Sequence, residues 1–162
     1  MYALKKTSNC FKNVFCCWKS HVANKKPTDY LRTVKYEDTI PFIPLITHGK
    51  VIKVYDGDTI TVASQLPFKG SPLYRFSVRM AHIDTPEMKG ATPSECELAI
   101  QSRDALHRLI FGKIVELRNH SREKYGRLLA DVYFHDLYIN DWMVERQFAI
   151  RYEGGKKTQR SE

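Results

Sequence analysis

Apolar and polar residues alternate along much of the chain, and this pattern predicts β-strands on both sides of a tight turn. In residues 49–64, GKVIKVYDGDTITVAS, Ile52 and Val54 are expected on one face before Asp56-Gly57. The alternation resumes after the turn, and Asp-Gly between two alternating runs is a strong β-hairpin signal. Residues 74–80 repeat the period of two, so a third strand is predicted there.

A helix is predicted after the third strand. The sequence TPSE at residues 92–95 has an N-cap threonine, a proline at the first helical position and a glutamate at the third. Gly112 is the expected stop. The small and apolar stripe of this helix is expected to face the core, and it consists of Leu98, Ala99, Ser102, Ala105, Leu106, Leu109 and Ile110.

The rest of the chain completes a pattern that is mainly β with α. Residues 113–121 and 127–136 are predicted strands, residues 139–148 a short helix and residues 149–152 a closing strand. Residues 27–47 are expected to be an extended lead-in. The order is therefore β-β-β-α-β-β-α, and five strands avoid exposed edges by closing into a small barrel capped by helices.

Charge and cysteine content narrow the classes of function. The chain has a formal net charge of +8, but residues 1–50 hold 9 Lys/Arg against 3 Asp/Glu, whereas residues 51–162 hold 17 against 15. A nucleic-acid partner therefore has to be argued from placed residues rather than from net charge. The four cysteines form no CxxC pair, so neither a zinc site nor a disulfide framework is expected.

The two ends of the chain differ from the predicted barrel. Residues 1–40 are expected to be a basic, flexible segment and residues 154–162 a polar tail. The beginning lacks the apolar core of a secretory signal, so an intracellular (cytoplasmic or virus-associated) location is expected. Its Lys, Phe, Trp and Cys residues leave two interpretations open: a disordered tail, or a peripheral membrane contact through residues 1–30.

Two acids and an arginine are difficult to explain by structure alone. Asp58 opens a predicted strand, where aspartate is disfavoured, and Asp84 ends another. Hard divalent cations take carboxylate and carbonyl oxygens, so Asp58, Asp84 and the Thr85 carbonyl would make a sparse cation site. Arg79 and Asp84 have opposite strand parity, so they cooperate only if the strand bends between them. Otherwise Arg79 is a surface arginine.

Three blocks of the sequence match a known family. VIKVYDGDTI, VRMAHIDTPE and EKYGRLLA occur in this order, with the predicted helix between the last two. Residues 48–153 thereby resemble the staphylococcal nuclease-like (thermonuclease) family, whose hallmark blocks are DGDT, R-x-x-x-x-D-T-P-E and K-Y-G-R. The resemblance implies a five-stranded OB-fold-type barrel over residues 41–153. It also implies a Ca²⁺-dependent nuclease that cleaves DNA and/or RNA, prefers single strands and leaves 3′-phosphates.

The resemblance also implies roles for the matching residues. These are calcium ligation by Asp58, Asp84 and Thr85, catalysis by Arg79, Glu87 and Arg127, and substrate binding by Lys124, Tyr125 and Tyr152. The family's long C-terminal helix is expected to be missing here, and a monomer is expected. One alternative stays open, a catalytically inactive OB-fold module that only binds nucleic acid; the joint presence of the three catalytic residue types argues against it.

Overall fold

The computed structural model describes residues 28–89 and 92–154, and the chain divides into two units, residues 1–40 and 41–162. The predictions made for residues 1–27 and 155–162, including most of the proposed membrane contact, lie outside the described residues. Among the described residues, no helix is long and apolar enough to cross a membrane.

The described part of the first unit forms two short 3-10 helices, η1 (Asp29–Thr33) and η2 (Tyr36–Asp38), none of whose residues is buried. The prediction of an extended lead-in over residues 27–47 is wrong for these turns. The reason is local hydrogen bonding. Lys35 N donates to Asp38 Oδ2 at 2.9 Å, and Thr39 Oγ1 donates to the Tyr36 carbonyl at 2.8 Å, which closes the second turn.

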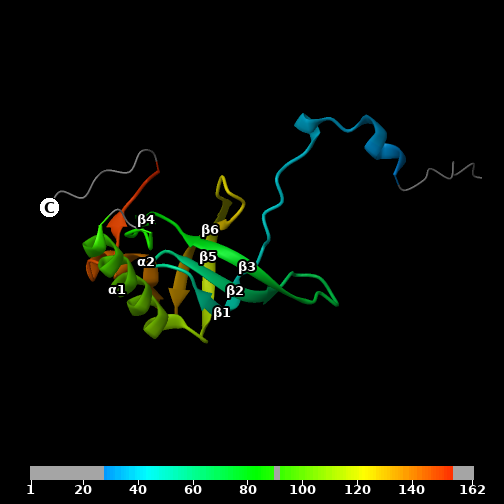
Figure 1. Ribbon diagram of the computed structural model, residues 1–162. Coiled ribbons are helices and arrows are strands. Elements are labelled where there is room, and N and C mark those ends of the chain that lie inside the picture. Colours follow the sequence, from blue (N-terminus) through cyan, green and yellow to red (C-terminus); the bar gives the residue numbers. More distant parts are fainter. Residues whose placement is uncertain (1–27, 90–91, 155–162) are drawn as a thin grey trace, which may run out of the picture. The chain divides into compact units, whose positions relative to one another are not determined.

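The second unit is a closed β-barrel with helices on one side (Figure 1). Its strands are β1 (His48–Val54), β2 (Thr59–Gln65), β3 (Leu73–Met80), β5 (Ile114–Arg122) and β6 (Leu128–Phe134). They follow the order β3-β2-β1-β5-β6, and a parallel pairing between β3 and β6 closes the barrel. The predicted five-stranded OB-type barrel and its element order are confirmed.

Short elements complete the unit. β4 (Ile83–Asp84) pairs with β8 (Ile150–Arg151), and β7 (Leu137–Tyr138) extends β6. The helices are α1 (Pro93–Ile110) and α2 (Ile139–Glu145). The core is aliphatic, and each large side chain that is fully buried stabilises the fold by about 1.5–3 kcal/mol. Fully buried members include Val51, Ile60, Val62, Val78, Met80, Leu106, Ile110, Leu117, Ile139 and Met143.

The predicted start and end of α1 are confirmed. Thr92 Oγ1 accepts a hydrogen bond from Glu95 N at 3.1 Å, and Pro93 occupies the first turn. After the helix, Gly112 has a φ of +74°, a conformation that glycine adopts without strain. Leu98, predicted to be core, is instead 45% exposed, because it lies at the edge of the buried stripe rather than within it.

A β-bulge in β1 overturns the prediction that Ile52 and Val54 share one face of this strand. The register between β1 and β2 shifts between Val51 and Lys53. Val51 and Val54 are therefore the buried residues of this strand, whereas Ile52 is 38% exposed. One extra residue in a strand reverses the facing of the residues beyond it, and the alternation in the sequence does not reveal this reversal.

A turn between β3 and β4 redirects the chain toward the candidate site. His82 has a φ of 61°, in the left-handed region that is uncommon for a residue with a side chain. The fully buried Asn140 of α2 holds this turn in place. Its Nδ2 donates to the Ala81 carbonyl at 2.8 Å, and its Oδ1 accepts from Val132 N at 3.1 Å.

We expect Asn140→Ala to destabilise the fold by about 2–4 kcal/mol, because it leaves two buried backbone groups without their partners. Urea unfolding measures this loss. Gln101→Ala, at an exposed position of α1, is the control and should change stability by less than about 0.5 kcal/mol. A loss for Asn140→Ala no larger than that of the control would contradict the role of Asn140.

Candidate active site

A single cavity of about 460 Å³ gathers every residue that the sequence predicted for the site. Its lining comes from the β1–β2 turn, the end of β3, the segment after β4, the β5–β6 loop and the chain after β8. The predicted residues that line it are Asp58, Arg79, Asp84, Thr85, Glu87, Lys124, Tyr125, Arg127 and Tyr152. Segments distant in the sequence thus meet at one hollow on the outside of the barrel.

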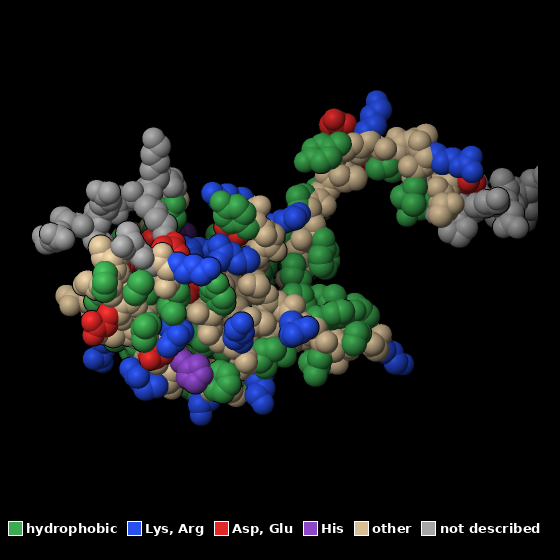
Figure 2. All heavy atoms as spheres, viewed as in Figure 1, with side chains coloured by type: hydrophobic (Ala, Val, Ile, Leu, Met, Phe, Trp, Pro, Cys, Tyr) green, Lys and Arg blue, Asp and Glu red, His purple; other side chains and the backbone are tan. Residues whose placement is uncertain are grey.

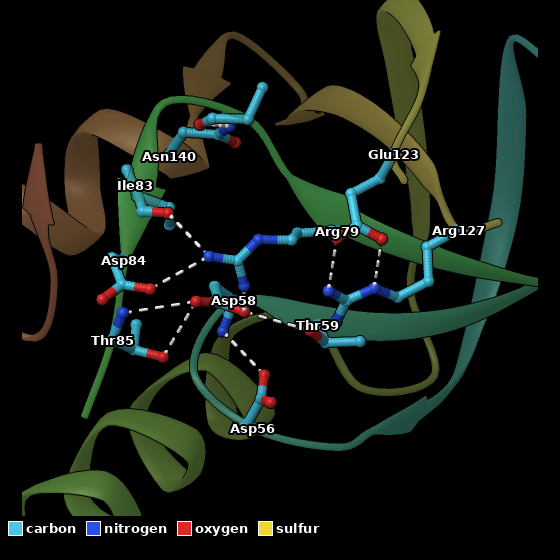
Figure 3. Close-up of polar contacts among 11 residues, drawn as sticks. Asp56, Asp58, Thr59, Arg79, Ile83, Asp84, Thr85, Glu123, Arg127 and Asn140 are labelled. Carbon is cyan, nitrogen blue, oxygen red and sulfur yellow. Dashed lines mark hydrogen bonds and ion pairs between the residues drawn. The ribbon is translucent and has the colours of Figure 1, made fainter. Parts of the chain in front are cut away.

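Asp58 is the most enclosed acid of the cavity, at 2% exposure. The turn before it is shaped by Asp56, whose Oδ1 accepts from Asp58 N at 3.1 Å. Both carboxylate oxygens of Asp58 have donors (Figure 3). Thr59 Oγ1 and Arg79 Nη1 donate to Oδ1, and Thr85 donates to Oδ2 through N at 3.2 Å and Oγ1 at 3.1 Å.

Arg79 bridges two carboxylates (Figure 3). Its Nη1 pairs with Asp58, and its Nη2 donates to Asp84 Oδ1 at 3.0 Å and to the Ile83 carbonyl at 3.3 Å. The left-handed turn at His82 removes the parity conflict, because it brings Asp84 back toward the face of β3 that carries Arg79. The side chain is 17% exposed, so the alternative of an ordinary surface arginine does not describe it.

Burial dominates the electrostatics of Asp58. Burial and, second, the neighbouring charge of Asp56 together raise the pKa of this carboxyl from 3.8 to about 6, against the opposing effects of Arg79 and the Thr59 hydrogen bond. Five acidic residues line the cavity against three basic ones, so its lining carries a formal excess of negative charge. A bound cation would favour the ionised form.

Arg127 lies directly before β6 and is held by Glu123, which was not among the predicted site residues. Its Nε and Nη2 donate to the two carboxylate oxygens of Glu123 at 3.1 Å each, and its Nη1 donates to Thr59 Oγ1 at 3.2 Å. These hydrogen bonds from Arg127 are the main reason why the pKa of Glu123 is lowered. Glu123 and Arg127 lie four residues apart in the β5–β6 loop, and opposite charges this close in the sequence are a local signal that could have identified this pair.

The remaining predicted residues form the rim of the cavity. Lys124 and Tyr125 lie in the β5–β6 loop, with the Lys124 ammonium 4.7 Å from the Tyr125 ring centroid. Tyr125 is 74% exposed. Glu87 is exposed directly after the buried Pro86, and Tyr152 lines the cavity from the chain beyond β8. Basic side chains (blue) gather beside acidic ones (red) on the barrel face that Figure 2 shows.

The donors of the cavity suit a hard divalent cation. Asp58, Asp84 and Thr85 offer oxygen atoms, and acidic residues outnumber basic ones in the lining around them. Within residues 28–89 and 92–154, no three His, Cys, Asp or Glu side chains cluster as a metal site. A cation here would therefore depend on two carboxylates and a carbonyl, and would leave other positions to water and substrate.

The fold and the site together define an OB-type barrel with an acidic and arginine-lined cavity on its outer face. The family model for the staphylococcal nuclease homologue matches residues 77–162. An uncharacterized endonuclease of Escherichia coli O157:H7 is 31% identical over 125 residues, which are 76% of this chain and 73% of the relative. The chain belongs to the family of staphylococcal nuclease homologues.

Other relatives match shorter parts of the chain. An uncharacterized endonuclease of Haemophilus influenzae is 34% identical over 104 residues, 64% of this chain and 52% of the relative. A probable staphylococcal-like nuclease of Oryza sativa is 32% identical over 79 residues, 49% of this chain and 19% of the relative. The similarity to the plant protein thus concerns a part of each chain.

We expect the stability of the wild type relative to an Asp58→Asn variant to depend on pH. The folded-state pKa of Asp58 is raised, so its stabilising contribution is complete below about pH 4 and is lost as the pH rises through 6. One pKa unit corresponds to about 1.4 kcal/mol, so the relative stability should fall by on the order of 2–3 kcal/mol. Urea unfolding from pH 4 to 8 with a chelator present measures this.

Asp136→Asn, at an exposed position between β6 and β7, controls for the loss of one carboxylate. A difference between wild type and Asp58→Asn that stays constant from pH 4 to 8 would contradict the burial argument for Asp58.

Proposed function

We propose that this chain is a Ca²⁺-dependent nuclease that hydrolyses phosphodiester bonds of DNA and/or RNA and prefers single strands. Membership of the family and relatives named as endonucleases identify the chain as a nuclease, that is, a hydrolase. The observation that carries the finer proposal is the shared cavity. The residues proposed for catalysis and those that suit a cation line the same hollow; they are Arg79, Arg127, Glu87, Asp58 and Asp84.

Asp58, Asp84 and the carbonyl of Thr85 are the residues that would hold the calcium ion. Bound there, Ca²⁺ would supply Lewis-acid chemistry to a phosphate oxygen. The protein's own contribution is to place two acids close together in a buried position. Because Arg79 occupies one oxygen of each acid, the site is already arranged around a positive charge.

Arg79 and Arg127 are proposed to bind the phosphate that is cleaved. A guanidinium has five N–H donors, and each of these two uses three of them in hydrogen bonds to the protein. Each therefore keeps two N–H groups that can bind phosphate oxygens while its three hydrogen bonds to the protein stay intact. Charge that builds up on those oxygens in the transition state is stabilised by such fixed donors.

Glu87 is proposed as the general base. It lies at the exposed end of the segment that follows Asp84, where Pro86 restricts the backbone. Its carboxylate takes a proton from the attacking water, whose oxygen forms the new bond to phosphorus. The bond to the 5′-oxygen breaks, and that oxygen takes up a proton from solvent, so the products are a 3′-phosphate and a 5′-hydroxyl.

Tyrosines at the rim support the preference for single strands. Tyr125 presents most of its ring to solvent, and Tyr152 lines the same cavity. Unpaired bases stack on exposed aromatic rings, whereas the bases of a duplex are already stacked on one another. Lys124, which lies against the Tyr125 ring, adds a positive charge for a terminal phosphate.

We expect Glu87→Gln to lower kcat on single-stranded DNA by about 10²–10⁴-fold, the usual contribution of general-base catalysis. Removal of Ca²⁺ with EGTA should abolish wild-type cleavage, and added Ca²⁺ should restore it. Glu97→Gln, at an exposed position of α1, is the matched control and should retain wild-type kcat.

Equal cleavage by wild type, Glu87→Gln and EGTA-treated wild type would exclude this mechanism. Binding of single-stranded DNA by the wild type with no cleavage under any of these conditions would instead favour the inactive OB-fold binding module.

We expect Tyr125→Ala to raise KM for single-stranded DNA by about 5-fold or more, because one stacked base contributes about 1–3 kcal/mol. Tyr125→Phe keeps the ring and should stay close to the wild type. Steady-state kinetics on a single strand and on its duplex measure the effect. An equal rise of KM on both substrates would contradict the stacking role.

A further inference from the structure

A second hollow, of about 430 Å³, adjoins the candidate active site. Arg127 lines both cavities, so they meet at this side chain. The second hollow is bounded by the segment before β1, by β3 and by the end of β5 with the loop that follows. We call it the extension groove, and its lining includes Phe42, Arg75, Phe76, Arg122 and Arg127.

The charged side chains of the extension groove are positive. Arg75 and Arg122 are exposed, and neither makes an ion pair or a side-chain hydrogen bond within the described part of the chain. Arg75 and Arg79 lie on the same face of β3, because residues two and four apart in a strand share a face. Four residues span about 13 Å along a strand, so Arg75 and Arg79 lie at separate positions on this face of β3.

Two aromatic rings line the extension groove: the exposed Phe42 and the partly buried Phe76, which packs against the core. Phe42, which lines the groove, is 72% exposed. Tyr74 meets Phe76 edge to face, with ring centroids 6.2 Å apart. Phe42 is held at the rim because the chain beyond it enters the core at Ile46, which is 2% exposed. Exposed rings beside unpaired arginines are the features that bind unstacked bases and their backbone.

We propose that the extension groove binds the nucleotides of a single strand next to the phosphate that is cleaved. Its arginines supply positive charge for this role. The groove also meets the candidate active site at Arg127, so a nucleic-acid strand can pass from one cavity to the other. The inference rests on the proposed function and deepens it. It identifies the substrate as an oligonucleotide longer than a dinucleotide, held by phosphate contacts to Arg75 and Arg122 and by stacking on Phe42.

The first test measures binding rather than cleavage. Fluorescence anisotropy of a labelled 20-nucleotide single strand, with EDTA present, gives Kd for the full chain and for an Arg75→Gln, Arg122→Gln double variant. Kd should rise about 10-fold or more. The slope of log Kd against log salt should fall by roughly 1.4, because each lost phosphate contact of a single strand contributes about 0.7.

Arg108→Gln, at an exposed position of α1 outside both cavities, removes one positive charge and is the control for each of the single variants Arg75→Gln and Arg122→Gln as well as a reference for the double variant. Phe42→Ala should weaken binding about 5-fold with an unchanged salt slope, and Phe42→Trp should restore it, because a larger ring stacks on a base equally well.

The second test separates the two cavities. The ratio of kcat/KM for the 20-nucleotide strand to kcat/KM for a dinucleotide should fall about 10-fold in the double variant relative to Arg108→Gln. Equal losses on both substrates would overturn the proposal, because the arginines would then act at the reaction site or on the fold. An unchanged Kd and salt slope would also overturn it, as would equal weakening for a duplex of the same length.

Failure of the proposed function gives a different result. If the wild type cleaves neither substrate, the nuclease mechanism fails, while the anisotropy measurements still decide whether the extension groove binds a single strand.

Discussion

The bridge that Arg79 makes between Asp58 and Asp84 is the interaction on which the candidate site depends. Two acids buried side by side would repel each other when ionised, and burial and the charge of Asp56 already raise the pKa of Asp58 to about 6. A guanidinium between them offsets part of this cost and ties together the β1–β2 turn, β3 and β4. The same arrangement leaves two N–H groups of Arg79 at the cavity without a protein acceptor in the part of the chain that the structure describes. One side chain therefore stabilises the fold and is available for the proposed chemistry.

Closure of the barrel provides the second arginine. The parallel pairing of β3 with β6 brings Arg127, directly before β6, to the same region as the end of β3. Glu123 then holds the guanidinium of Arg127 in a two-point contact, so its direction is set before any substrate binds. Because Arg127 lies between the two cavities, it links the proposed reaction site to the extension groove.

Much of the fold and of the site could be predicted because its signals are local. The period of two in the strands, the cap at Thr92 and the stop at Gly112 depend on neighbouring residues only. The exposure of Ile52 and Leu98 and the short helices η1 and η2 were not predicted. The exposure of Ile52 follows from a bulge in its pairing with another strand, and that of Leu98 from the limited width of a packing contact. Neither cause is encoded in the alternation of residues or in helical spacing.

The amino-acid sequence by itself determined the element order, the residue types of the site and the family blocks that connect them. Only the tertiary structure decided that Arg79 turns toward Asp84, because this depends on a left-handed turn at His82 that the buried Asn140 stabilises. Only the tertiary structure revealed the groove beside Arg127. These features depend on contacts between segments distant in the chain, and such contacts follow from barrel closure rather than from local preference.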